Sequence, residues 1–96
     1  YRGKPILYSL GNYAFGTPGR EWLRHGLVAR LHVDPERKRL RRVELVPLLI
    51  QNRIVNFRPE IVDGAEARKV LGELRRRSTA YGAKLSLKGG RAWLAL

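Results

Sequence analysis

Alternation of apolar and polar residues in the middle of the chain predicts the first strand of a β-hairpin. From Gly26 onward, one side of the chain is apolar and the other side is mixed. The apolar side carries Leu27, Ala29, Leu31 and Val33, and the other side carries Val28, Arg30 and His32. Asp34 and Pro35 then fit the first two positions of a type I turn, because the fixed φ of proline suits the second position. A half-buried strand followed by a turn is therefore expected here.

The returning strand of this hairpin is predicted over residues 40–48. Its alternation places Val43 and Leu45 inward and Arg42 and Glu44 outward. The tip between the two strands is highly basic and comprises Arg37, Lys38, Arg39, Arg41 and Arg42. Beyond it lie apolar residues 48–50, a polar break at Gln51-Asn52, and a second apolar segment with Ile54, Val55 and Phe57. Pro47 and Pro59 each remove a ladder donor, so we expect these stretches at sheet edges or strand ends.

A short apolar run near the amino end predicts a strand buried on both faces. It consists of Ile6, Leu7, Tyr8 and Leu10. Gly11-Asn12 is a turn signal that ends it, and residues 13–25, which contain Gly16, Pro18 and Gly19, are expected to form a loop.

One amphipathic helix is predicted over residues 63–82. Asp63 can cap its amino end, and Glu66, three positions later, can complete a capping box. Four apolar residues then recur at helical spacing, namely Ala67, Val70, Leu71 and Leu74. Arg75, Arg76 and Arg77 in the last turns favour the carboxyl end of the helix dipole, and Gly82 suits the end of the helix.

The last residues, 84–96, predict a second hairpin around Gly89-Gly90. Two consecutive glycines suit the positive φ angles of a type I′ turn. This register pairs Leu87 with Ala92 and Leu85 with Leu94, and sets Trp93 opposite Ser86. The fold class expected is α+β, built of antiparallel hairpins and one helix. We expect residues 1–96 to form a single unit. It comprises a strand, loop and hairpin region (1–62), the helix (63–82) and the final hairpin (84–96).

Composition limits the chain to one small domain and narrows its partners. Its 96 residues are 44% apolar, and the absence of cysteine excludes disulfides and thiolate metal sites. No apolar run approaches the ~20 residues that cross a bilayer, and no leader sequence opens the chain. The formal net charge is +12, which favours polyanionic partners. An arginine-rich composition bias explains that charge equally well, so a nucleic-acid partner is disfavoured on charge alone.

The segment Gly3–Asn12, "GKPILYSLGN", resembles a signature near the end of the bacterial capsule synthesis (PGA-cap or CapA-like) family. This family is associated with poly-gamma-glutamate synthesis and belongs to the calcineurin-like metallophosphoesterase superfamily. The matching residues are Gly3, Lys4, Pro5, Ile6, Tyr8, Ser9, Leu10, Gly11, Asn12 and Phe15, whereas Tyr13 replaces the usual phenylalanine. The similarity is fair to about Pro59 and weak beyond it. The resemblance implies an α/β/β/α sandwich fold and a hydrolase activity that uses divalent metal ions. It also implies a location at the cell envelope.

The metal-binding motifs of that family do not occur in this sequence. They are Asp-x-His, Gly-Asp, Asn-His and Gly-His-x-His, whereas this chain has two aspartates and two histidines in all, Asp34, Asp63, His25 and His32. A two-metal centre needs more ligands than these. Tyr1 at the start and the absence of methionine also lead us to expect a carboxyl-terminal portion of a longer protein. Its partner would be the amino-terminal catalytic part, and this portion alone would be inactive and hold no cofactor.

The candidate site residues follow from the same motif. Tyr8, Ser9, Gly11 and Asn12 would lie near the expected metal cleft, although Ser9 as a small strand residue and Gly11-Asn12 as a turn is the simpler interpretation. Three cations could contact an anionic substrate, namely Lys4, Arg20 and Arg24. His25, expected in an exposed loop, and His32, among arginines on a strand, are poor metal ligands. No catalytic residue is assigned.

Two alternatives to the capsule-protein hypothesis stay open. The first is a basic β-rich module that binds a polyanion, either nucleic acid or an anionic polymer, at a surface such as the hairpin tip. Against it, the aromatic residues Trp22, Tyr81 and Trp93 are scattered along the sequence rather than interleaved with the basic residues. The second is a packing domain that covers a catalytic sheet and contacts no ligand.

Overall fold

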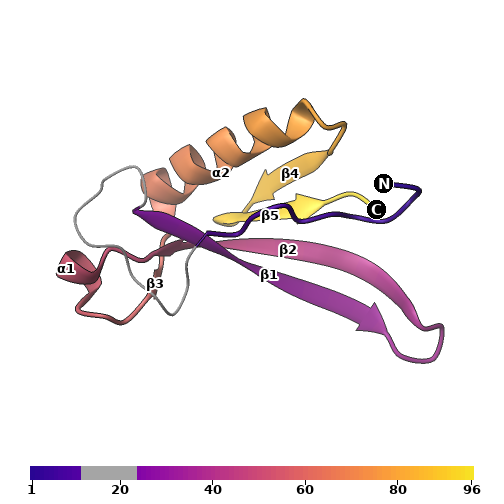
Figure 1. The fold of residues 1–96 in the computed structure, drawn as a ribbon, viewed down its shortest axis with the longest axis horizontal. Helices are drawn as coiled ribbons and strands as arrows, with labels where there is room; N and C mark the ends of the chain where they lie inside the picture. Colours follow the sequence, from indigo (N-terminus) through magenta and orange to yellow (C-terminus); the bar gives the residue numbers. More distant parts are fainter. Residues whose placement is uncertain (12–23) are drawn as a thin grey trace.

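The computed structural model describes residues 1–11 and 24–96, which form an α+β fold around one antiparallel sheet (Figure 1). The sheet has five strands in the order β1-β2-β5-β4, with β3 paired to β2 off this path. The strands are β1 (His25–Asp34), β2 (Arg39–Leu49), β3 (Glu60–Ile61), β4 (Leu85–Lys88) and β5 (Arg91–Leu94). The helices are α1 (Asn52–Val55) and α2 (Gly64–Thr79). The α+β class expected from the sequence is confirmed.

β1 and β2 form the long hairpin that the alternating pattern predicts. Leu31 pairs with Val43, and Arg30 pairs with Glu44. The turn is closed by Asp34, whose Oδ1 accepts a hydrogen bond of 3.0 Å from the Arg37 amide. The register shifts after His32, which leaves Arg41 as an extra residue on β2, as in a β-bulge.

The second hairpin joins β4 to β5 with the register predicted from the sequence. Leu85 pairs with Leu94, Ser86 with Trp93 and Leu87 with Ala92. Gly89 and Gly90 have φ angles of +58° and +69°, which the type I′ turn requires and which L residues rarely adopt. β5 then pairs with the middle of β2, at Val43, Glu44 and Leu45, so the two hairpins form one sheet.

Helix α2 begins after Asp63, as predicted, and its end is fixed by Gly82. The amides of Gly82 and Ala83 donate to the carbonyls of Thr79 and Ser78 at 2.9 and 3.2 Å. With φ of +76° at Gly82, this arrangement is a Schellman motif. The predicted capping box is wrong: Asp63 makes no side-chain cap hydrogen bond, and the Glu66 carboxylate contacts His25 instead.

Two clusters of the core lie between α2 and one face of the sheet, whereas a third lies on the opposite face, because side chains alternate along β2. The central cluster comprises Val43, Leu45, Leu71 and Ala92. A second cluster, around the start of α2, comprises Leu49, Val55, Val62 and Ala67, and a third comprises Val46, Leu48 and Ile50, with Val28 packed against it. Residues 43–50 are therefore buried along their whole length, which explains why this part of β2 is almost continuously apolar.

The segment after β2 differs from the strand-like segment that its apolar residues suggested. Residues 52–55 form one helical turn, α1, in which the amides of Ile54 and Val55 donate to the Gln51 carbonyl. Val55 is buried, whereas Ile54 and Phe57 are exposed. Positive φ angles at Asn56 and Phe57 follow and end the helical turn.

The buried amino-terminal strand predicted over residues 6–10 is absent from the structure. Ile6 is 51% and Tyr8 is 78% exposed, and residues 4–10 form no strand. Leu10 is the anchor of the segment: it packs against the central cluster, and its carbonyl accepts a hydrogen bond of 2.7 Å from the Leu27 amide. The prediction is wrong because no described strand pairs with residues 6–10, so nothing in the described sheet buries their side chains.

Candidate functional site

Lys4 and Tyr8, from the motif near the amino end, line a groove beside the carboxyl end of α2. The groove has a volume of about 500 Å³. Its opposite wall is formed by Ser78, Tyr81, Gly82, Ala83 and the last residues, 94–96. The Tyr8 and Tyr81 rings contact each other at a tilt of 40°, with centroids 5.6 Å apart. Three exposed tyrosines, Tyr1, Tyr8 and Tyr81, and one lysine therefore border an open groove next to both chain ends.

Ser9 and Gly11 shape the backbone where this segment meets β1. The Ser9 hydroxyl accepts a hydrogen bond of 3.4 Å from the Gly11 amide. Gly11 has a φ of +75°, and a Cβ on it would lie 3.4 Å from the Gly26 Cα. Gly11 therefore has a turn conformation, whereas Ser9, which the simpler interpretation placed in a strand, lies outside the described strands. Asn12, a candidate from the motif, and Arg20, a candidate anion contact, lie outside the described residues.

Arg24 lies in a different hollow, of about 640 Å³, between the start of β1 and α2. Its Nε is buried, lies 3.8 Å from the Glu66 Oε1 and has no hydrogen-bond partner. His25 Nε2 lies 2.7 Å from the same carboxylate oxygen. His25 is therefore a half-buried first residue of β1, and the exposed loop position predicted for it is wrong. The structure does not bring Lys4 and Arg24 together, since they line separate hollows.

The described residues, 1–11 and 24–96, contain no group of three or more His, Cys, Asp or Glu side chains placed to hold a metal ion. Within the same ranges, no helix is long and apolar enough to cross a membrane.

On the face of the sheet opposite α2, one carboxylate, Glu44, is contacted by three cationic or ionisable side chains of the described chain. Because side chains alternate along a strand, the neighbours of the buried Val43, Leu45 and Ala92 point away from α2. Register then places Arg30, Glu44, Trp93 and Ser86 in one cross-strand row and His32 and Arg42 in the next. We call this surface the polar face and define it by Arg30, His32, Arg42, Glu44, Arg91 and Trp93.

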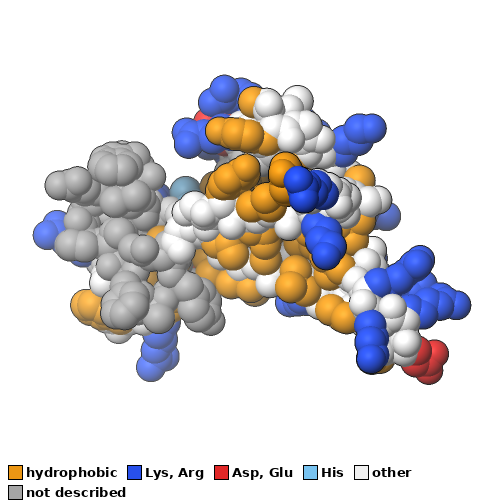
Figure 2. All heavy atoms as spheres, turned by 45° about the vertical axis from the view of Figure 1, so that its right-hand side comes forward, with side chains coloured by type: hydrophobic (Ala, Val, Ile, Leu, Met, Phe, Trp, Pro, Cys, Tyr) orange, Lys and Arg blue, Asp and Glu red, His pale blue; other side chains and the backbone are white. Residues whose placement is uncertain are grey.

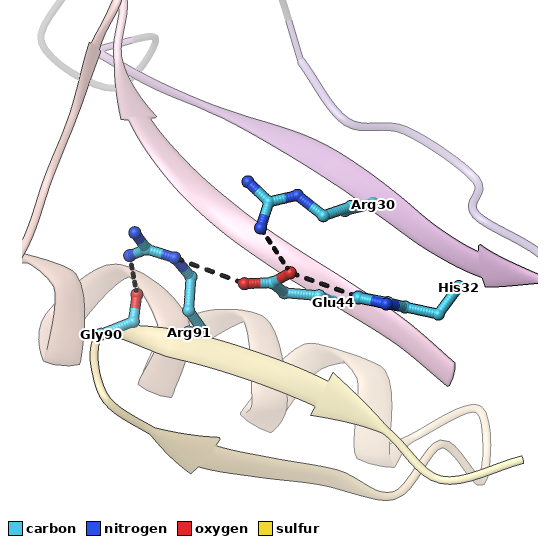
Figure 3. A network of polar contacts seen from close by, with 5 residues as sticks. All are labelled: Arg30, His32, Glu44, Gly90 and Arg91. Carbon is cyan, nitrogen blue, oxygen red and sulfur yellow. Dashed lines mark hydrogen bonds and ion pairs between the residues drawn. The ribbon is translucent and has the colours of Figure 1, made fainter. Parts of the chain in front are cut away.

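Glu44 is the centre of the polar face (Figure 3). Its Oε2 accepts a hydrogen bond of 3.0 Å from Arg30 Nη1 and lies 3.5 Å from His32 Nε2, and its Oε1 lies 3.6 Å from Arg91 Nε. The outward direction predicted for Glu44 is correct, yet the residue is only 5% exposed. A buried carboxylate needs charged or hydrogen-bonding partners, and three cationic or ionisable side chains supply them here.

Trp93 stands beside this cluster. The Arg42 guanidinium lies over the Trp93 ring at 4.4 Å from its centroid, a cation–π distance, and the His32 ring centroid lies at 6.2 Å. The prediction that aromatics are separate from the basic residues is therefore wrong for Trp93. The register predicted for the β4-β5 hairpin already placed Trp93 on the side of the hairpin away from Leu85 and Leu87. The pairing of β5 with β2, which brings Trp93 close to Arg42, has no local sequence signal.

The basic tip of the β1-β2 hairpin continues the polar face. Asp34 Oδ2 lies 3.8 Å from Arg37 Nη1 and 3.7 Å from Arg41 Nη1. Register places Arg39, opposite Asp34, and Lys88, opposite Arg91, on the same side of the sheet. The guanidinium groups of Arg37 and Arg41 are thus held at one end by a carboxylate and are open to solvent at the other.

Comparison of the chain with family models, with curated proteins and with solved structures gives no match. The function is therefore argued from the motif and from the geometry above.

Proposed function

We propose that this chain is the carboxyl-terminal portion of a CapA-like capsule or poly-gamma-glutamate biosynthesis protein with a metallophosphoesterase-like fold. Its catalytic metal ligands would lie in a preceding part of the same protein. The motif Gly3–Asn12 suggests the family. The observation that carries the proposal is the exposure of the apolar residues in that motif.

Apolar side chains of the motif and of the hairpin arm are exposed on the described chain. Ile6, Leu7 and Tyr8 are exposed on the amino-terminal segment, as are Leu31 and Val33 on the α2 side of the β1 arm. Figure 2 shows hydrophobic side chains gathered above the basic hairpin tip, which lies at the lower right. Exposed apolar groups on a segment with strand-like sequence, and with no described strand beside it, favour a further structural partner. The partner proposed is the catalytic part of the same protein.

The reaction proposed for the whole protein is metal-assisted hydrolysis or transfer at a phosphate ester or a related bond. Two divalent ions in such centres stabilise both the attacking and the leaving oxygen. This chain would contribute structure beside that centre: the motif segment becomes a strand, and Lys4 at its exposed end offers a cation to an anionic substrate. Arg24, paired with Glu66 in the other hollow, would stabilise the junction of β1 with α2 rather than contact substrate.

A binding experiment with two matched variants tests this proposal. The preceding part of the protein is produced separately, and its affinity for the 96-residue chain is measured by calorimetry. Ile6→Asp should abolish binding, whereas Ile61→Asp should leave it unchanged, because Ile6 and Ile61 are similarly exposed (51% and 55%) but only Ile6 lies in the motif. Equal effects of the two substitutions would contradict the proposed interface.

An activity assay addresses the reaction. With Mn²⁺ and a generic phosphodiester, the full protein should turn over in a metal-dependent way, and the 96-residue chain alone should not. The reading frame should also encode a Gly-His-x-His element ahead of Tyr1. Metal-dependent turnover by the isolated chain, or a preceding sequence without such an element, would refute the assignment.

A further inference from the structure

We propose that the polar face of the sheet, together with the basic hairpin tip, binds single-stranded nucleic acid. The inference rests on contacts among described residues and does not depend on the proposed capsule-protein function. It needs neither a metal ion nor a second part of the protein.

The first support is the charge of this side of the sheet. Its strands present six cationic side chains, namely Arg30, Arg39, Arg41, Arg42, Lys88 and Arg91. On the same side, the carboxylates of the described strands are Asp34 and Glu44, and both are already paired with arginine. Phosphate groups attract such a surface strongly, because each neutralised phosphate releases condensed counterions.

The second support is the way these carboxylates orient the arginines. The Glu44 side chain is 6% exposed and contacts one nitrogen each of Arg30 and Arg91, while the Arg30 side chain is 60% exposed. Arg41 is held in the same manner by Asp34, and its side chain is 63% exposed. A guanidinium has five N–H donors, so the remaining donors are free to contact phosphate oxygens. Holding the side chains in advance lowers the entropy lost on binding.

The third support is the aromatic ring within the cationic surface. Trp93 lies in the same row as Arg30 and Glu44, and Arg42 and His32 are its neighbours. Bases stack on aromatic rings and on guanidinium planes, whereas a carboxylate or sulfate polymer without aromatic groups has nothing that stacks in this way. A tryptophan ring on the surface of a sheet can stack on bases that are exposed, as they are in a single strand. In a duplex the bases are stacked on one another, and their edges are reached through grooves that admit a protruding helix or ribbon. The site therefore favours single strands over duplexes and over other polyanions.

Two matched double variants test whether the surface or the net charge is responsible. Binding of the 96-residue chain to a fluorescent oligothymidylate is measured by anisotropy at several salt concentrations. Arg39→Ala with Arg42→Ala should weaken binding and make the slope of log K against log salt shallower by about 1.4, at roughly 0.7 per lost phosphate contact. Arg68→Ala with Arg75→Ala removes the same charge from exposed positions of α2 and should leave the slope unchanged. Equal effects of the two pairs would overturn the proposal.

Trp93 variants and competitors test the class of ligand. Trp93→Leu should weaken oligothymidylate binding by about 5- to 100-fold, and Trp93→Phe should retain most of it, since a phenyl ring still stacks. Should Trp93→Leu fail to fold, quenching of Trp93 fluorescence by the oligonucleotide in a Trp22→Phe background gives the same answer. Polyphosphate or duplex DNA that competes as well as the single strand at equal charge, or an absence of quenching, would overturn the assignment to single-stranded nucleic acid.

Discussion

Glu44 and Arg30 lie directly opposite each other on β2 and β1, and Arg30 Nη1 donates a hydrogen bond of 3.0 Å to Glu44 Oε2. The carboxylate is buried while the guanidinium is mostly exposed. Arg91 Nε and His32 Nε2 approach the same carboxylate from β5 and β1. Since one buried anion is contacted from three positions on two neighbouring strands, the charge of Glu44 adds side-chain contacts to the backbone pairing that joins the two hairpins.

Replacing Glu44 with glutamine is therefore expected to lower the free energy of unfolding by about 1.5–3 kcal/mol, the range for hydrogen bonds to charged groups. Urea unfolding followed by circular dichroism measures this change. Glu36→Gln, at the exposed hairpin tip, removes the same charge and should change stability by less than about 0.5 kcal/mol. Similar losses in both variants would mean that net charge, rather than the network, is responsible.

Local patterns predicted the elements whose signals are contained within a few neighbouring residues. Both hairpins were predictable, because period-2 alternation, Asp34-Pro35 and Gly89-Gly90 specify strands and turns locally. The carboxyl end of α2 was predictable for the same reason, because it depends on the positive φ of Gly82, whereas the capping box predicted at the amino end does not form.

Features that depend on contacts between distant elements were not predictable. The burial of Glu44 needs Arg91, 47 positions later, and the cation–π contact of Trp93 needs Arg42. The capping-box signal at Glu66 was overridden because His25, far away in sequence, lies 2.7 Å from its carboxylate. Of the candidate site, the sequence supplied the motif and the basic tip, but it could not bring Trp93 to the arginines.

Glu73 should give a pH-dependent contribution to stability in strong acid. Hydrogen bonds first from Arg76 and then from Arg77 lower the pKa of Glu73 from 4.5 to about 2. A lowered folded-state pKa stabilises the fold above the unfolded value, and this contribution is lost as the pH falls from about 4.5 through about 2. Carboxyl NMR titration should give a midpoint near 2 that rises in high salt, because the group is exposed and screened.

Two variants distinguish the direct hydrogen bond between Arg76 and Glu73 from the general effect of a nearby positive charge on the Glu73 pKa. Arg76→Gln removes the leading hydrogen bond and should raise the Glu73 pKa clearly. Arg75→Gln removes an equal charge at an exposed position, and Arg75 has no ion pair to Glu73 among the described contacts, so the midpoint should move little. An unshifted midpoint in Arg76→Gln would contradict the assigned cause.

Leu71 should be the most sensitive position of α2. It is 1% exposed and packs against Val43, Leu45 and Ala92. Leu71→Ala is expected to cost about 2–5 kcal/mol, because the substitution removes buried methyl groups and leaves a cavity. Leu31→Ala deletes the same atoms at a position that is 54% exposed and should cost less than about 1 kcal/mol. Thermal and urea unfolding of both variants measure the difference, and comparable losses would contradict the position assigned to the core.

Two glycines of the same region should respond oppositely to alanine. Gly82 has a φ of +76°, and Gly72 lies in the helical interior of α2; an added Cβ meets nothing within 4 Å at either position. Both positions therefore have room for a Cβ, and they differ in backbone conformation. Gly82→Ala should cost about 1–2 kcal/mol, since an L side chain is strained in the left-handed region and the Schellman motif requires it. Gly72→Ala should stabilise the protein by about 0.5–1 kcal/mol, because alanine loses less backbone entropy in a helix. Urea unfolding of the two variants should change the free energy of unfolding in opposite directions. A change in the same direction in both would mean that the Schellman motif at Gly82 does not terminate α2.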